Sequence, residues 1–442
     1  MQLPDCHLVG HTSYKRVFLN STKPLSAVAP CEEANPHALE LIVGAAETQE
    51  IVASEDIYDD RNVKLWAAGQ PVTRSLQERL LERKLKRPLE ACLRAKDGLT
   101  IVDLLGAADE FISSDHALAI ASRPYAAHIA RELQQVPLHS VVQLLLTAVR
   151  ATRPQVFEHA VRGMVVAGAM AASRAKKDDY FLRLALLGGL LHDIGEMYVN
   201  PQYLATSHLL SPQDYRYVVA HPRIGEMVLM SQTDYPDALA RAIGEHHERM
   251  DGNGYPKQLF KDKISPLGQL LAVMETTLGI ASASQNPLSR ASFAMRVVPG
   301  EYALEWLGFI ANAAHQAAED LGVTAAAEPP GANEALDGID TKMVAAMASA
   351  KKLSTTAPSQ ATRDVAAKAL HLLNRLRAGW NGMGLWSGGS DDEPADQQFE
   401  RLMARRELRY RLRYVQRECL WPERTLTPED LKPLQPLWDT LE

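Results

Sequence analysis

Apolar positions recur at helical spacing through most of the chain after about residue 100. This spacing predicts helices at residues 138–149, 154–173, 178–194, 236–250, 266–283 and 301–321. Ser211 followed by Pro212 predicts the start of a further helix, because serine caps a helix and proline suits its first position. We expect this helix to carry His221. We therefore expect a mainly α protein whose centre is a bundle of helices.

Residues 1–100 have a different pattern, which predicts a small mixed α/β domain. Two short apolar stretches flank the polar turn at residues 59–62 and predict a β-hairpin. Ser75 and Glu78 have the spacing of a capping box, and Pro88 would end the helix that they begin. The apolar face of that helix would consist of Leu76, Leu80, Leu81 and Leu85. A hairpin and one helix bury little surface, so we expect this domain to pack on a neighbour, as a regulatory domain or a structural cap.

The composition indicates two breaks in the second half of the chain. Residues 324–333 predict a linker and residues 384–396 a flexible stretch. We therefore expect units at residues 1–100, 101–323 and 334–442, the last being a helical C-terminal region. Residues 400–418 hold seven arginines and three glutamates. This charge pattern predicts a solvated helix face, with a partner surface or an anionic-ligand patch as the alternative.

The overall charge and the cysteines narrow the function classes. The formal net charge is −7 and the isoelectric point is about 6.1, which gives no indication of DNA binding. The four cysteines lack the spacing of a metal or disulfide framework. We find no secretory signal pattern and no apolar run of the ~18 residues that would span a bilayer. The expectation is a cytoplasmic protein without a membrane span.

Residues 190–275 concentrate side chains that bind transition metals. These are His192, Asp193, His221, His246, His247 and Glu275. Histidine and carboxylate ligands together suit iron, manganese or zinc rather than calcium. The adjacent His-Asp pair also supplies a carboxylate that can bridge two ions. The pattern predicts a metal site built from several helices.

The order HD, then HxxxG, then HHExxDGxGYP resembles the HD-GYP family, a branch of the HD phosphohydrolases. His192-Asp193 match the first motif, and His221 with Gly225 match the second. The third motif is matched by His246, His247, Glu248, Asp251, Gly252, Gly254, Tyr255 and Pro256. His159 fits an earlier family histidine on the preceding long helix. The resemblance covers roughly residues 138–322 and implies an HD-type helical bundle core.

The resemblance also implies a binuclear centre of two divalent transition-metal ions, iron or manganese, with zinc as the alternative. One ion would be held by His159, His192, Asp193 and Glu275. The other would be held by Asp193, His221, His246 and His247, with Asp193 as the bridge. Such an ion pair supplies a nucleophile derived from water and clamps a phosphate, so no protein nucleophile is needed. Gly254, Tyr255 and Pro256 would border the substrate.

The family hydrolyses cyclic di-GMP to pGpG, and in some members on to GMP, and its GYP loop has been linked to diguanylate cyclase domains. We therefore expect a cyclic di-GMP phosphodiesterase, with a diguanylate cyclase domain as an additional partner and the oligomeric state left open. Three positions depart from the family. Glu275 replaces the usual aspartate, and Gln155 occupies the place of a third-ion glutamate, which favours two ions.

The third departure is Glu196, which stands where the family commonly has lysine. It reverses a charge close to an anionic substrate, so we expect Glu196, together with Asp193, to bear on catalysis. Two alternatives follow. One is a catalytically weak or inactive HD-GYP protein that acts as a nucleotide-binding or regulatory module, and the other is an HD hydrolase of another nucleotide.

Overall fold

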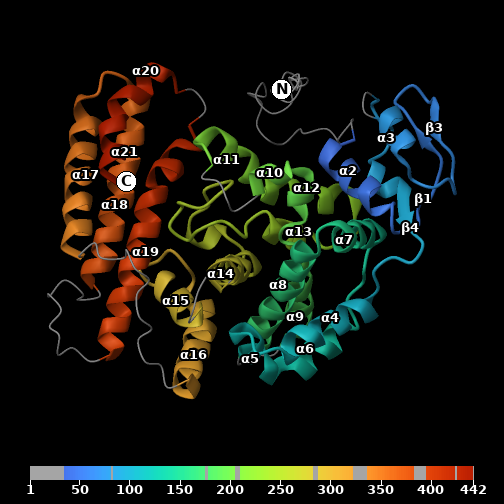
Figure 1. Ribbon diagram of the computed structural model, residues 1–442, viewed down its shortest axis with the longest axis horizontal. Helices are drawn as coiled ribbons and strands as arrows, with labels where there is room; N and C mark the ends of the chain where they lie inside the picture. The colour runs from blue at the N-terminus through green and yellow to red at the C-terminus, as the bar shows by residue number, and fades with distance from the viewer. Residues whose placement is uncertain are drawn as a thin grey trace, which may run out of the picture.

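The computed structural model describes residues 34–80, 83–174, 178–204, 210–281, 287–321, 336–382, 395–423 and 426–441. Helices make up most of the described chain, which confirms the mainly α prediction (Figure 1). The expected linker at residues 324–333 lies outside the described residues. The same is true of the expected flexible stretch at residues 384–396 except for its last two residues, which begin a helix.

The N-terminal region contains short strands and helices, as its mixed pattern predicted. Strands β2 (Ile57–Tyr58) and β3 (Lys64–Trp66) form the expected antiparallel hairpin. A second antiparallel pair joins β1 (Ile51–Ala53) to β4 (Leu93–Ala95), which the sequence analysis did not predict. Helix α2 (Pro36–Ala45) packs on α7 (Ser140–Thr152) of the central bundle, so this region does pack on a neighbour.

The helix expected from Ser75 to Pro88 is shorter than predicted. Helix α3 spans Arg74–Leu80, so Ser75 lies inside the helix and does not cap it. Leu85 instead pairs with Asp59 in an isolated β-bridge. Backbone hydrogen bonds from Asp60 to Lys84 (2.9 Å) and from Lys86 to Tyr58 (3.1 Å) hold this segment beside the hairpin. These long-range pairings outweigh the local helical pattern of the leucines.

Two long helices form the centre of the molecule. Helices α4 (Ile101–Ser113), α5 (Ala117–Ser122), α6 (Ala126–Leu133) and α7 (Ser140–Thr152) precede α8 (Pro154–Ala172) and α9 (Asp179–Leu191). Helices α8 and α9 pack very closely, since a Cβ on Gly189 would lie 2.2 Å from the Gly163 carbonyl oxygen. Gly163 and Gly189 therefore allow the two backbones to meet.

Further elements complete the central bundle around α8 and α9. They are the 3-10 helix η3 (Ile194–Tyr198), α10 (Pro201–Leu204), α11 (Pro212–Val218), α12 (His221–Gln232), α13 (Asp237–Ile243), α14 (Pro266–Ala281), α15 (Pro287–Ala294) and α16 (Leu304–Leu321). Helix α14 packs against α8, α9 and α13. Buried side chains from Leu39 to Ala314 form one hydrophobic core, which joins the N-terminal region to this bundle.

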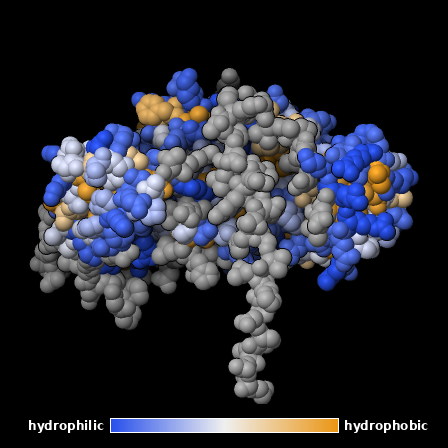
Figure 2. Space-filling model, turned by 90° about the horizontal axis from the view of Figure 1, so that it is seen from above, coloured by the Kyte–Doolittle hydropathy of each residue, from blue (hydrophilic) through white to orange (hydrophobic). Residues whose placement is uncertain are grey.

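The C-terminal region is a second group of helices, whose core also includes Phe293 of α15 and Val297 and Val298 just after it. It consists of α17 (Leu336–Thr356), α18 (Gln360–Gly382), α19 (Ala395–Leu420), α20 (Pro428–Leu431) and α21 (Gln435–Leu441). Its core includes Leu373, Trp380 and Trp438. Helix α19 lies on the side that adjoins the central bundle and contacts α11 and α15 (Figure 1). The described surfaces at both ends of the molecule are mostly hydrophilic, with small apolar patches (Figure 2). Among the described helices, none is both long and apolar enough to cross a membrane.

Candidate metal centre

The seven side chains singled out as metal ligands come from five places in the central bundle. His159 lies on α8 and Glu275 on α14. His192 follows the last residue of α9, and Asp193 stands in the turn before η3. His221 is the first residue of α12, while His246 and His247 lie in the turn after α13.

Three of these positions correct the helix bounds expected from the sequence. The helix before the HD pair ends at Leu191, not at residue 194. The helix that begins at Ser211 ends at Val218, so His221 belongs to the next helix. The helix expected to reach Met250 ends at Ile243. In each case the histidine stands where helical backbone pairing stops, and a carbonyl near the helix end is free to accept from its ring.

That free carbonyl orients the imidazole ring. Nδ1 of His192 lies 2.9 Å from the Gly189 carbonyl oxygen. The corresponding distances are 2.7 Å from His221 Nδ1 to Val218 and 2.6 Å from His246 Nδ1 to Ile243. A carbonyl only accepts, so Nδ1 carries the proton and Nε2 keeps its lone pair. Such second partners fix the tautomer of a metal-binding histidine. The motif spacing alone did not reveal these carbonyls.

The first group of potential ligands comprises His159, His192, Asp193 and Glu275, whose ligand atoms lie within 4.8 Å of one another. His192 Nε2 is 3.1 Å from Glu275 Oε2 and 3.1 Å from Asp193 Oδ2. His159 Nε2 is 3.3 Å from Glu275 Oε2 and 3.2 Å from His192 Nε2. The longer arm of glutamate at position 275 therefore still reaches this group.

The second group comprises Asp193, His221, His246 and His247 within the same limit. Asp193 Oδ1 is 3.3 Å from His221 Nε2 and 3.4 Å from His246 Nε2. The two Nε2 atoms are 3.0 Å apart. Asp193 thus presents Oδ2 to the first group and Oδ1 to the second.

The chemistry of these contacts fits a pair of bound cations. His221 and His246 both present a lone pair at Nε2, because their Nδ1 protons point to carbonyls. Two lone pairs 3.0 Å apart repel unless a proton or a cation lies between them. His192 Nε2 meets two carboxylate oxygens in the same way. The donor set of imidazole and carboxylate is the set that iron, manganese and zinc prefer.

The electrostatics of the groups also favour positive charge. Burial lowers the pKa of His159, but the Asp193 and Glu275 carboxylates outweigh it and raise the pKa to about 10. For His192 the same opposition places the pKa well above its usual value. Burial opposes ionisation of Glu275, yet hydrogen bonds from His159 and His192 hold its pKa well below the usual range. The carboxylates of Asp193 and Glu275 therefore stay charged and attract cations.

Glu196 lies in η3, three residues after Asp193, and is half-buried. Burial, and next the charge of Asp193, raise its pKa to about 7. Its ligand atoms do not belong to either four-residue group among the described residues. A carboxyl group therefore stands close to Asp193 at this position.

The turn that holds His192 and Asp193, here called the HD turn, lies very close to α12 because of Gly195 and Gly225. A Cβ on Gly195 would lie 2.0 Å from the His221 carbonyl oxygen and 2.8 Å from the Gly225 nitrogen. Gly195 follows the end of a helix, but its φ is not positive, so it does not serve as a left-handed cap. Its role is instead close approach, which brings Asp193 and His221 together.

The loop that carries the GYP motif is folded back onto the turn that holds His246 and His247, here called the histidine turn. The buried carboxylate of Glu248 accepts the backbone N–H groups of Lys257 (2.6 Å) and Leu259 (2.9 Å). A Cβ on Gly254 would lie 2.4 Å from Glu248 Cα, so only glycine permits this fold. The Tyr255 ring stacks on His247 with centroids 4.5 Å apart. The loop thus lies directly beside the second group.

Glu245 is a further residue whose role the sequence did not indicate. Its buried carboxylate accepts from the Ser265 backbone N–H (2.8 Å) and hydroxyl (2.5 Å) at the start of α14. It therefore ties the histidine turn to the helix that carries Glu275.

Comparison with known proteins gives a family for this part of the chain. The family model described as HD domain matches residues 143–278. Over 202 residues the chain is 27% identical to cyclic di-GMP phosphodiesterase PA4108 of Pseudomonas aeruginosa, covering 46% of this chain and 47% of that protein. Over 182 residues it is 30% identical to 3'3'-cGAMP-specific phosphodiesterase 3 of Vibrio cholerae, covering 40% and 38%.

A third relative is the cyclic di-GMP phosphodiesterase response regulator RpfG of Xanthomonas campestris, 29% identical over 119 residues, which are 27% of this chain and 31% of that protein. The chain thus spans less than half the length of these relatives. All three relatives are named phosphodiesterases. Residues 143–278 thus match the HD-domain family model, in agreement with the resemblance to the HD-GYP family.

Proposed function

We propose that this chain is a metal-dependent phosphodiesterase that hydrolyses cyclic di-GMP to pGpG or GMP with two divalent transition-metal ions, iron or manganese, or else zinc. The observation that supports this most is the pair of four-residue groups that share the two oxygens of Asp193. Two ions held in this way would supply Lewis acidity at phosphorus and a nucleophile derived from water.

The residues of the chain would prepare the site for that chemistry. Asp193 would bridge the two positions and set the spacing between them. The carbonyls of Gly189, Val218 and Ile243 would keep three Nε2 lone pairs directed at the centre. No step in this scheme needs a nucleophilic side chain.

The GYP loop and Glu196 would act on the substrate side. Gly254, Tyr255 and Pro256 lie beside His247 and would form one border of the substrate site. Glu196 would face the anionic phosphate and weaken its binding at a pH above the pKa of about 7 that its surroundings give it. We propose that turnover is therefore modest rather than absent.

A second candidate substrate is 3'3'-cGAMP, which the printed name of one Vibrio cholerae relative specifies. The two cyclic dinucleotides differ in one base, and the ligand groups act on the phosphate that they share. A third candidate is a regulatory module that binds the nucleotide without turnover, which the charge of Glu196 favours.

The test is a product assay with the full chain loaded with manganese or iron. Cyclic di-GMP and 3'3'-cGAMP are offered separately, and the linear products are separated by chromatography. Faster hydrolysis of cyclic di-GMP supports the proposal, and faster hydrolysis of 3'3'-cGAMP supports the second candidate. Binding without product supports the regulatory module, and neither binding nor product contradicts all three. We also propose a cytoplasmic location and leave a diguanylate cyclase partner to binding assays with such a domain.

A further inference from the structure

The C-terminal region reaches the metal centre through one aromatic side chain. Trp421, the residue directly after α19, is 9% exposed and contacts Tyr255 edge to face, with ring centroids 6.1 Å apart and planes at 74°. The Tyr255 ring also stacks on His247, at 4.5 Å and 22°. Trp421, Tyr255 and His247 therefore form a continuous row of rings that ends at a proposed metal ligand.

His247 has a particular need for this support. The rings of His192, His221 and His246 are each oriented by a carbonyl three residues earlier. Within the described residues, no hydrogen bond of this kind is made by His247. Its ring instead contacts the rings of His246, at 4.3 Å, and of Tyr255. The stack on Tyr255 thus takes the place of the orienting carbonyl.

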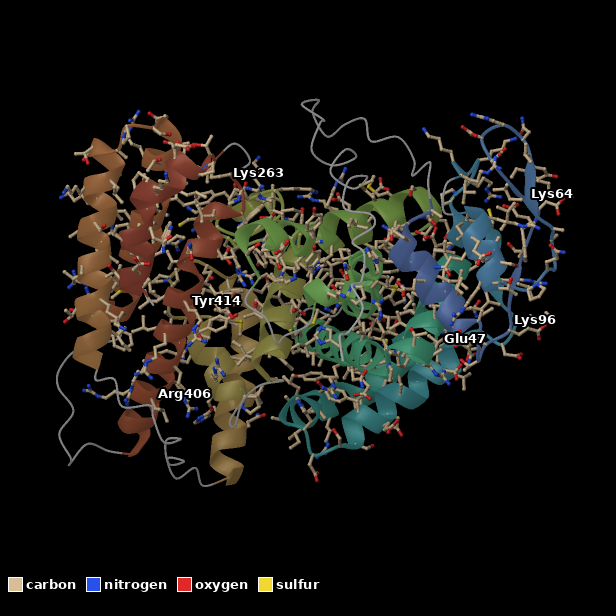
Figure 3. All side chains as sticks on the ribbon, turned by 45° about the horizontal axis from the view of Figure 1, so that its top comes forward. Glu47, Lys64, Lys96, Lys263, Arg406 and Tyr414 are labelled. Atoms are coloured by element: carbon tan, nitrogen blue, oxygen red, sulfur yellow. The ribbon has the colours of Figure 1, made fainter. Side chains whose placement is uncertain are left out.

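Trp421 is itself fixed by its neighbours. Arg216 Nε donates to the Trp421 carbonyl oxygen (3.0 Å), and its Nη2 donates to Glu423. Tyr215, one residue before Arg216, meets Tyr255 edge to face with centroids 6.1 Å apart. The Arg417 guanidinium lies 4.0 Å from the Tyr215 ring centroid and 4.1 Å from that of Tyr414. Tyr414 lies on the side of α19 that adjoins the central bundle (Figure 3).

Two further contacts fix the beginning of the same loop. Asp251 forms an ion pair with Arg375 of α18, whose Nη2 also donates to the Pro299 carbonyl oxygen (2.7 Å). The Met250 N–H donates to the Glu301 carbonyl oxygen (2.9 Å), and the Glu301 carboxylate pairs with Arg411 of α19 (2.8 Å). The C-terminal region therefore holds both the start of the loop and its tyrosine.

We propose that Trp421 is a positioning residue for the metal centre, which acts through Tyr255 on the ring of His247. The inference rests on the proposed function only in taking His247 as a metal ligand. It assigns the C-terminal region a part in building the centre. We expect Trp421 to affect metal binding only at the second ligand group, because only that group contains His247.

The test uses the full chain, stripped of metal with a chelator and titrated with Co²⁺ while its visible absorption is followed. Wild type is expected to bind two ions. Trp421→Leu keeps an apolar side chain, so the protein folds, but it removes the ring contact with Tyr255. We expect the affinity of one position to fall about 10-fold, the lower end of the usual loss when a partner of a metal ligand is removed. The other position keeps its affinity, and Trp421→Phe restores most of the loss.

Trp438→Leu is the matched control. Trp438 is buried in the same C-terminal region, on α21, and belongs to the region's own core. This variant removes the same ring from that region and leaves the contact with Tyr255 in place, so both affinities should match wild type. Folding of each variant is checked by circular dichroism.

Three results overturn the inference. Folded Trp421→Leu with both Co²⁺ affinities unchanged shows that the ring row does not position His247. Equal losses in Trp421→Leu and Trp438→Leu show a general effect of destabilising the region. If the wild-type protein binds no Co²⁺, the metal centre is absent, and both the proposed function and this inference fail. If only the variants give a contrary result, this inference fails and the proposed function stands.

Discussion

Substituting Gly195 with alanine should separate the HD turn from α12. The new Cβ would lie 2.0 Å from the His221 carbonyl oxygen, whereas real Cβ atoms essentially never come closer than 3.0 Å. The turn and the helix would therefore have to move apart by about 1 Å, and the obstacle is backbone, which cannot rotate away. Overpacking of this kind typically costs about 1–3 kcal/mol.

The same movement should weaken metal binding. His221 Nε2 lies 3.3 Å from Asp193 Oδ1, and both residues flank the contact that Gly195 makes. A functional site tolerates displacements of roughly 0.5 Å, so a 1 Å shift of His221 against Asp193 exceeds what the site can absorb. We expect the Co²⁺ affinity of the second position to fall and the urea midpoint of the metal-free protein to decrease.

Gly106→Ala is the control for this variant. Gly106 lies on α4, and a Cβ there meets nothing within 4 Å. Alanine is favoured over glycine inside a helix by about 0.5–1 kcal/mol, so this variant should be slightly more stable than wild type and bind metal equally. A Gly195→Ala protein with the stability and Co²⁺ affinity of wild type would refute the close-approach argument.

Three further predictions concern charges at the centre. Asp193→Ala should lower occupancy at both metal positions, since its two oxygens face different groups; elemental analysis that finds only one position emptied would contradict the bridging role. Glu196→Lys should tighten cyclic di-GMP binding by about 1–3 kcal/mol with metal content unchanged, as measured by nucleotide titration, whereas loss of an ion would identify Glu196 as a ligand. In the metal-free protein, the folded pKa of His159 is raised from 6.5 to about 10, so its stabilisation is fully present below pH 6.5 and is lost as the pH rises through 10. The urea midpoint should fall over that interval more in wild type than in His159→Gln, and equal slopes would show that His159 does not contribute.

The sequence could name the proposed ligands because their motifs are local and their spacing is unusual. His192, His221 and His246 could be named from short patterns, and the helical period placed α8, α9 and α14 around them. The helix bounds near these residues were less predictable. The helix ends at Leu191 and not at residue 194, and the Gly189 carbonyl accepts a hydrogen bond from the His192 ring. Such a contact depends on three-dimensional packing.

Contacts between distant segments could not be predicted from one sequence. The pairing of β1 with β4 joins strands separated by about forty residues, and its short strands show no alternating pattern. Arg375 and Trp421 gave no signal that would associate them with Asp251 and Tyr255. Residues 400–418 were expected to form a solvated face, yet Arg411 of this segment forms an ion pair with Glu301 of the central bundle. Such contacts depend on which surfaces the fold brings together.

The metal content of the purified chain tests the account most directly. The protein is produced in medium supplemented with iron and manganese, purified without chelator and measured by elemental analysis against protein concentration. Two groups that share Asp193 predict about two transition-metal ions per chain. A folded protein that contains none would contradict the assignment of His159, His192, Asp193, His221, His246, His247 and Glu275 as ligands, and the phosphodiesterase proposal with it.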